Sequence, residues 1–286
     1  MVAAATPYAM LTNMDDILQL YPASQQLRAL KCLYLDLNLH RKAVVGEVLI
    51  YSNYIASLDG RISLRNADSG EFFVPESIAN KRDWRLYQEL AAQADVMLTS
   101  ARYFRQLALG SAQDLLPIGR EQAYADLSDW RLQQGMRPQP DVAILSQSLD
   151  IPAEALEKVQ DRRVMICTGE RADDKQVSRL ESLGCTVEIV GAERVEGNLL
   201  KQQLISDGFR SAYMIAGPEV HRTFIGDGVL DYLFLTTHLS LLGHHDFHTI
   251  VSGSLGRSVK ADLHRLYLDQ GAPCQQLFAQ YALHQA

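Results

Sequence analysis

The sequence lacks several features that would place it in a special class of protein. No apolar run approaches the roughly 20 residues that a membrane-spanning helix needs. The start, Met1 to Tyr8, has neither the basic nor the apolar region of a secretory signal. There is no low-complexity tract and no basic excess, since the net charge is −7. These absences argue against a membrane or nucleic acid as a partner and favour a cytoplasmic protein.

Paired cysteines are also missing. The four cysteines lie far apart with no Cys-x-x-Cys pair, which indicates reduced thiols rather than a disulfide or zinc framework. Cys167 falls in an apolar run and is expected in the core. The segment His244-His245-Asp246-Phe247-His248 could suggest zinc, but it is predicted as a loop between strands without a second ligand pair. We therefore expect no metal.

The usual nucleotide-binding fingerprints are absent as well. No Gly-x-Gly-x-x-Gly follows the first predicted strand, and there is no P-loop. Gly226-Asp227-Gly228 lacks the third glycine and follows a helical pattern. A Rossmann dehydrogenase is thereby disfavoured.

Strand and helix patterns alternate from Glu47 onward. Strands are predicted at 48–56, 95–100, 141–146, 163–168, 186–190, 211–216 and 231–239. Helices are predicted at 76–94, 124–134, 173–183, 198–207 and 218–225. This order predicts a mainly parallel sheet with helices on both faces. Strand-like pieces at 263–269 and 276–282 favour antiparallel strands closing one edge.

Local signals place several helix ends. Asp173 and Asn198 are candidate N-caps, Pro218 suits a first helical position, and Gly184 and Gly208 suit positions just after a helix.

We expect one domain over residues 45–286 and an N-terminal extension over 1–44. The extension is predicted helical at 15–20 and 24–39, with Ser24 as an N-cap. The alternation in 33–39 would equally suit a strand.

Polar residues gather where predicted strands end, which is where open α/β sheets bind ligands. Ser57, Asp59 and Arg61 follow the first strand around a turn that Gly60 permits. A surface turn is the alternative. The second strand brings Thr99, Ser100, Arg102 and Arg105 to its C-terminal end, and paired arginines beside hydroxyls suit phosphate groups. A solvated helix start would look the same. Ser146 and Ser148 end the third strand in the same manner.

The turn Ile215-Ala-Gly-Pro-Glu-Val220 runs from a strand through Gly217 into a helix. The free N–H groups of a helix start bind phosphate, and glycine lets the backbone approach a ligand. The alternative is a plain strand-to-helix connection. Lys81, Arg82 and Arg85 lie together on a predicted helix, as a solvated face or with Arg85 turned toward a site.

Four landmarks in order resemble the riboflavin-biosynthesis reductase family, whose fold is that of dihydrofolate reductase. They are Ser57-Leu-Asp-Gly-Arg61, Ala94-Asp-Val-Met-Leu-Thr-Ser-Ala-Arg-Tyr-Phe-Arg105, Ile144-Leu-Ser-Gln-Ser-Leu-Asp-Ile-Pro152, and Ile215-Ala-Gly-Pro with Gly228-Val-Leu-Asp-Tyr-Leu and Leu242-Gly243. The resemblance covers about Val48 to the C-terminus. It implies a three-layer α/β/α domain with a mostly parallel mixed sheet, and a homodimer.

The resemblance also implies an activity and a site. The activity is NADPH-dependent reduction of 5-amino-6-(5-phosphoribosylamino)uracil, with hydride transfer to the ribosyl C1. By position, the cofactor site comprises Ser57, Thr99, Ser100, Arg102, Tyr103, Ser148, Ala216, Gly217, Pro218, Glu219 and Val220. The substrate site comprises Asp59, Arg61, Arg85 and Arg105, with Asp59 as the catalytic proton relay.

Departures from the family pattern keep two alternatives open. The family's Glu-Gly-Gly is Ala216-Gly217-Pro218 here, and Tyr103 stands where the family has threonine. A reductase of another small metabolite, such as a pterin, or a dinucleotide-binding module without catalysis would fit these changes. No deaminase signature occurs, so the sequence does not predict the bifunctional enzyme.

Overall fold

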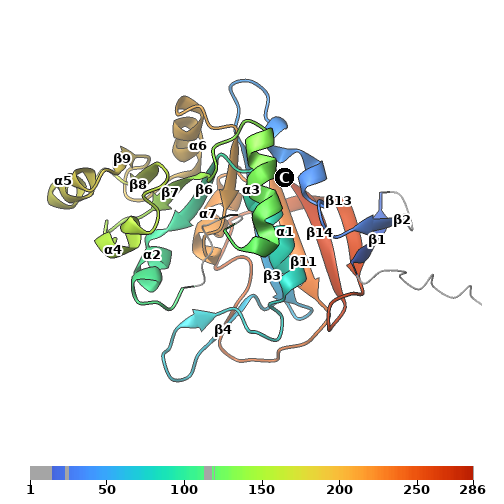
Figure 1. Cartoon of the computed structure of the whole chain (residues 1–286). Coiled ribbons are helices and arrows are strands. Elements are labelled where there is room, and N and C mark those ends of the chain that lie inside the picture. The colour runs from blue at the N-terminus through green and yellow to red at the C-terminus, as the bar shows by residue number, and fades with distance from the viewer. Residues whose placement is uncertain (1–14, 23–25, 113–117, 119, 286) are drawn as a thin grey trace, which may run out of the picture.

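The computed structural model describes residues 15–22, 26–112, 118 and 120–285 (Figure 1). Within them, eleven strands form one sheet in the order β2-β1-β13-β14-β11-β3-β10-β6-β7-β8-β9. A second, small sheet has the order β12-β4-β5 and consists of Phe247–His248, Ser63–Arg65 and Phe72–Phe73.

Seven neighbouring strands of the large sheet are parallel. They are β11 (Tyr232–His238), β3 (Leu49–Ser57), β10 (Ser211–Met214), β6 (Val96–Ser100), β7 (Asp141–Leu145), β8 (Val164–Thr168) and β9 (Thr186–Ile189). The antiparallel edge consists of β14 (Gln276–Gln285), β13 (Val259–Asp269), β1 (Asp16–Tyr21) and β2 (Gln26–Ala29). The predicted mostly parallel sheet with antiparallel C-terminal strands is confirmed.

Helices cover both faces of the sheet. They are α1 (Lys81–Ala92), α2 (Ala101–Ala108), α3 (Ala125–Gln133), α4 (Ala153–Glu157), α5 (Asp174–Ser182), α6 (Gly197–Ser206) and α7 (Pro218–Gly226). The sequence did not predict α2 and α4. No helix of the described residues is long and apolar enough to cross a membrane.

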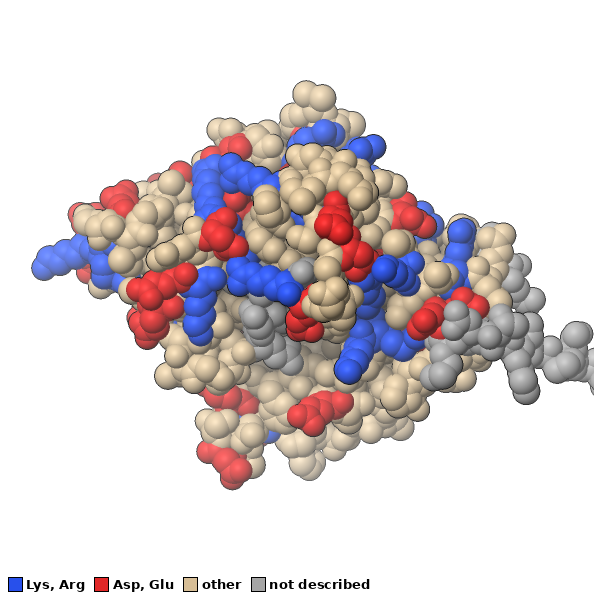
Figure 2. Space-filling view, viewed as in Figure 1, with Lys and Arg blue, Asp and Glu red and all other residues tan. Residues whose placement is uncertain are grey.

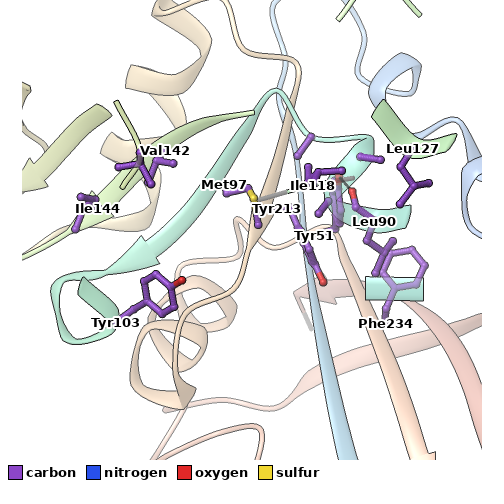
Figure 3. Packing of buried hydrophobic residues seen from close by; sticks show 14 of the residues in the cluster. Tyr51, Leu90, Met97, Tyr103, Ile118, Leu127, Val142, Ile144, Tyr213 and Phe234 are labelled. Carbon is purple, nitrogen blue, oxygen red and sulfur yellow. Dashed lines mark hydrogen bonds between the residues drawn. The ribbon is translucent and has the colours of Figure 1, made fainter. Parts of the chain in front are cut away.

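Successive strand residues pack into two separate cores. Met97 and Tyr213 belong to the core beneath α1 to α5, whereas their neighbours Leu98 and Met214 belong to the core beneath α6 and α7. Figure 3 shows Tyr51, Tyr213 and Phe234 of three adjacent strands packed beside Leu90 of α1. Because side chains alternate between the faces of a strand, one sheet supports both helical layers. The three-layer prediction is confirmed.

The helices predicted before residue 40 are wrong. Residues 16–21 and 26–29 are strands, and β1 pairs with β13 at the edge of the main sheet. The sequence of β1 alternates in burial, with Ile17 and Gln19 buried, as the pleat of a strand requires. Residues 35–37 and 39–41 are short 3₁₀ helices (η1 and η2), neither α-helix nor strand. Ser24 lies outside the described residues.

Most of the predicted helix ends are found. Asp173 caps α5 through its side chain, Pro218 opens α7, and Gly184 and Gly208 adopt positive φ angles just after α5 and α6. Asn198 is not a cap, because α6 already begins at Gly197. The helix predicted from Glu76 begins at Lys81 instead, where the Asn80 side chain accepts hydrogen bonds from two backbone N–H groups.

Charges on the face shown in Figure 2 are mixed. Figure 2 shows acidic and basic side chains interspersed over the visible face. The described part of that face therefore carries no broad basic area of the kind that nucleic acid binds.

Candidate functional site

Two adjoining cavities lie where the parallel strands end. The first has a volume of about 730 Å³ and the second about 510 Å³. Both are lined by Ser100 at the end of β6 and by Gly217 and Pro218 after β10. The second also contains Ser146 and Ser148, which follow β7. This arrangement agrees with the prediction that polar residues gather at the strand ends. We call this edge of the sheet, with Ser100, Ser146 and Gly217, the rim.

Most of the predicted cofactor residues line these cavities. The first cavity contains Ser100, Arg102, Tyr103, Ala216, Gly217 and Pro218, and the second adds Ser148, Glu219 and Val220. Ser57 and Thr99 line neither cavity, because their side chains are buried in the sheet, with 1 % and 0 % exposure.

The structure does not gather the predicted substrate residues at the first cavity. Arg105 lines the second cavity, where it bonds the Asp150 carbonyl oxygen at 3.0 Å. Asp59, Arg61 and Arg85 line neither cavity. A catalytic role for Asp59 therefore stays a prediction without geometric support.

Asp59 instead braces a loop. Its carboxylate accepts hydrogen bonds from the backbone N–H groups of Leu242 and Gly243 and from the side chains of Ser57 and Arg61. These bonds, the Ser57 hydroxyl foremost, lower the pKa of Asp59 to about 2. The turn at 57–61 and the Leu242-Gly243 pair, far apart in sequence, are thus parts of one contact.

Arg85 belongs to a structural ion-pair network. Its guanidinium bonds Glu89 at 2.8 Å and both carboxylate oxygens of Asp126 at 2.9 and 2.8 Å. Its side chain is 9 % exposed. The prediction that Arg85 faces the substrate is not supported, because α1 turns this residue toward α3 and away from the cavities.

Two helix starts at the rim suit a phosphate group, and we call them together the cradle. Gly217 and Ser100 are the N-cap residues of α7 and α2, and neither helix start receives a side-chain cap. Gly217 has a φ of −68°, and a Cβ there would meet no protein atom within 4 Å. The protein itself therefore does not require glycine at 217, and the open space suits a ligand close to the backbone.

Two arginines flank the cradle. Arg102 and Arg105 have side chains 48 % and 40 % exposed, and their acidic neighbours Glu71 and Asp150 lie at 3.4 and 3.9 Å. Ion pairs this exposed are weak, so a bound phosphate can compete for either guanidinium. The donors present fit the phosphates of a dinucleotide.

Sequence reasoning missed the residues that α1 brings to the first cavity. Lys81, Asp83, Trp84 and Tyr87 line it, and Trp84 and Tyr87 stack with centroids 4.6 Å apart. The signal was Asn80, since an N-cap there starts the helix at Lys81 and places these side chains on its first two turns.

Asp83 is the most perturbed acidic group of the first cavity. Its Oδ1 accepts a hydrogen bond of 2.5 Å from Thr236 of β11. Burial raises its pKa to about 6, and the Thr236 bond opposes this shift only partly. Perturbed carboxyls in a cavity mark functional sites.

Tyr54 forms part of the wall of the first cavity, and His221 packs behind it. Tyr54 lines the first cavity, donates to the Ala216 carbonyl at 2.9 Å and packs against the ring of His221 at 4.7 Å. His221 is fully buried, with Nε2 at 3.2 Å from the Ser52 hydroxyl and Nδ1 at 2.5 Å from the Ile250 carbonyl oxygen. This histidine connects α7, β3 and the segment after β12.

His221 predicts a pH dependence of stability. Burial lowers its pKa to about 4 from the ordinary 6.5. Between these values the unfolded chain binds a proton that the folded chain does not, so this histidine lowers stability as pH falls, by up to about 1.4 kcal/mol per pH unit. The urea concentration at the midpoint of unfolding should fall between pH 7 and pH 5, and we expect it to fall less in His221→Gln than in the wild-type protein. The exposed His245→Gln variant serves as the control, and equal losses in all three proteins would contradict the assignment.

The small sheet carries His248 to the junction of the two cavities. His248 stacks on Phe72 with centroids 3.7 Å apart, and both residues line both cavities.

Among the described residues no three His, Cys, Asp or Glu side chains gather into a metal-binding group.

Comparison with known proteins gives a consistent result. The family model described as the RibD C-terminal domain matches residues 48–270. A curated relative, the 2,5-diamino-6-ribosylamino-4(3H)-pyrimidinone 5′-phosphate reductase of Aquifex aeolicus, is 22 % identical over 210 residues, covering 73 % of this chain and 84 % of the relative.

Solved structures share the fold. A pyrimidine reductase-like protein from Corynebacterium diphtheriae superposes with a TM-score of 0.64 at 17 % identity, over 85 % of this chain and 94 % of that one. The riboflavin biosynthesis reductase of Saccharomyces cerevisiae gives 0.56 at 13 % identity, over 88 % and 99 %. These likenesses confirm the predicted fold class.

Proposed function

The chain belongs to the family of the RibD C-terminal domain, as its four landmarks predicted, and on this premise we propose that it is an NADPH-dependent pyrimidine reductase. The proposed substrate is a ribosylamino-pyrimidine phosphate of riboflavin biosynthesis, the class named for the Aquifex relative. The observation that carries the proposal is the pair of adjoining cavities at the strand ends, into which two uncapped helix starts open.

The second cavity and the rim suit the cofactor. The backbone N–H groups after Gly217 and after Ser100, together with Arg102 and Arg105, would hold its phosphates. When bound, NADPH supplies the hydride that converts the ribosyl C1 into the end of an open ribityl chain.

The first cavity suits the substrate. Tyr54, Ile215, Trp84 and Tyr87 give it apolar walls that exclude water from the reacting carbon and orient a flat ring. Lys81, exposed at its edge, is placed for the substrate phosphate. Asp83 is the buried carboxyl that lines this cavity, and we assign to it the proton-relay role that the sequence predicted for Asp59.

The direct test is an NADPH-oxidation assay with the full chain and a ribosylamino-pyrimidine phosphate. We expect one NADPH consumed per ribitylamino product formed. Quenching of Trp84 fluorescence by NADPH without turnover of any pyrimidine or pterin would replace the proposal with a binding module. Turnover of a pterin alone would replace it with another reductase.

The homodimer implied by the family resemblance is also a proposal. Sedimentation of the full chain tests it directly, and a monomer at all concentrations would contradict it.

A further inference from the structure

The small sheet is attached to the large sheet where β3 and β11 end. These strands are parallel neighbours, and their last residues, Ser57 and His238, lie opposite each other. The chain that leaves β3 forms β4, and the chain that leaves β11 forms β12, which pairs with β4. Figure 1 shows β4 outside the large sheet. The way in which these two segments leave the large sheet therefore decides where the small sheet lies.

Asp59 holds the two departing segments together. It lies just after β3, and its carboxylate accepts the backbone N–H groups of Leu242 at 3.3 Å and Gly243 at 3.0 Å, which follow β11. Arg61, bonded to the same carboxylate, also donates two hydrogen bonds of 3.2 Å to the His244 carbonyl oxygen. One charged pair thus connects the two segments at the base of the small sheet.

The pairing of β4 with β12 continues from this contact and ends in a wall common to both cavities. The Ile62 N–H donates to the His248 carbonyl oxygen at 2.9 Å, and the Ser63 hydroxyl lies 3.2 Å from Nδ1 of the same histidine. Phe72 of β5 stacks on the His248 ring. Because the Phe72 and His248 side chains line both cavities, we call them the shared wall.

The carboxylate of Asp59 has no position left for a ligand. Its Oδ1 accepts from Ser57 and from Leu242. Its Oδ2 accepts from Arg61 and from Gly243. A carboxylate accepts about four hydrogen bonds, two on each oxygen, so this one is filled. With a pKa of about 2 it is also a weak proton acceptor near pH 7, and it lines neither cavity.

We propose that Asp59 is a positioning residue: by joining the segments that leave β3 and β11, it places the shared wall at the junction of the two cavities. The effect on ligands rests on the proposed reductase function, in which cofactor and substrate meet at this junction. Hydride transfer requires that donor and acceptor be held close together, so a displaced wall weakens the binding of both without removing a group that reacts.

The first test needs neither a ligand nor turnover. The pKa of His248 lies below its usual 6.5, because the ring is partly buried and Arg102 is near, while Glu219 opposes this shift. We expect Asp59→Asn to return the NMR titration midpoint of His248 toward 6.5, because a displaced wall regains contact with water. The spectrum of His248→Gln identifies the signal among the eight histidines. An unchanged midpoint in Asp59→Asn overturns the inference, whatever the activity of the protein.

The second test compares the changes in KM and kcat. We expect Asp59→Asn to raise KM about tenfold for NADPH and for the ribosylamino-pyrimidine phosphate, with a smaller fall in kcat. The pH dependence of kcat should stay as in the wild-type protein. Loss of a proton relay would instead lower kcat about 100-fold or more and remove one limb of its pH dependence. That result would overturn the positioning role.

Two further variants separate this role from general damage. Ser57→Ala removes one of the four hydrogen bonds to Asp59 and should change both readouts in the same direction by less. Asp246→Asn changes an exposed carboxyl in the segment between β11 and β12 and should leave the His248 midpoint and both KM values unchanged. Circular dichroism confirms that each variant is folded.

Failure of the inference differs from failure of the proposed function. If the wild-type protein reduces no ribosylamino-pyrimidine phosphate, the proposed function fails, and the His248 titration still decides what Asp59 does. If the wild-type protein is active and Asp59→Asn leaves both the midpoint and the KM values unchanged, the reductase stands and the inference is overturned. A shifted midpoint with unchanged KM values would show that the wall moves without touching a ligand, which also overturns it.

Discussion

Replacing Glu89 with leucine is expected to lower the free energy of unfolding by about 3–5 kcal/mol, the usual result of removing one partner from a buried ion pair. Glu89 is fully buried in α1 and bonds the backbone N–H groups of Cys32 at 2.6 Å and Tyr34 at 2.8 Å, as well as Arg85 at 2.8 Å. Leucine leaves these donors buried without an acceptor, and each such group costs about 1–3 kcal/mol. The urea midpoint measures the loss.

A graded control identifies the cause. Asp126, whose side chain is 31 % exposed, also pairs with Arg85. Asp126→Ala should cost only about 1 kcal/mol, because water replaces the lost contact. Hydrogen exchange should further show that Glu89→Leu lowers the protection of the backbone amides of residues 32–35 more than elsewhere, whereas Asp126→Ala does not. Equal destabilisation by the two variants would show that the backbone bonds to Glu89 contribute little.

This network also shows why the sequence misled us about Arg85. From sequence alone, an arginine on a predicted helix suits a phosphate as well as a carboxylate. Its choice depends on Asp126, 41 residues away, which reaches it only once α3 packs on α1. Pairings across such distances follow from the fold and have no local pattern.

The fold itself was predictable because its signals are local. The buried strands are short apolar runs, and the turns at Gly184 and Gly208 use glycine where φ is positive. The N-terminal strands were not predictable, because β1 gains its stability from pairing with β13, about 250 residues later. The resemblance covered residues 48 onward and gave no guide there.

The candidate site was half predictable for the same reason. Ser100 ends one predicted strand and Gly217 follows another, so their place at the rim could be inferred from the order of elements. Asp83 follows no strand. Its partner Thr236 is 153 residues away, and the helix start that positions it was placed five residues too early. An N-cap assigned at Asn80 would have brought Asp83 and Trp84 to the rim.

Gly217→Val is expected to weaken NADPH binding by at least about tenfold, or about 1.4 kcal/mol, while the stability of the free protein changes by less than about 1 kcal/mol. The reason is the open space at this residue. A Cβ meets no protein atom within 4 Å and φ is −68°, so the side chain replaces no native contact and extends where the cofactor phosphates are proposed to lie. Fluorescence titration with NADPH measures the affinity, and the urea midpoint measures the stability.

Gly226→Ala provides the matched comparison on the same helix. Gly226 ends α7, also with nothing within 4 Å of a Cβ, but it lines neither cavity. Its replacement should leave the dissociation constant for NADPH unchanged, so the two variants together separate ligand exclusion from any general effect on α7. If Gly217→Val binds NADPH as tightly as the wild-type protein, the phosphates do not approach this helix start, and the cofactor must occupy the strand ends in another way. If instead both variants bind weakly, α7 as a whole moves on binding and Gly217 is not a point of direct contact.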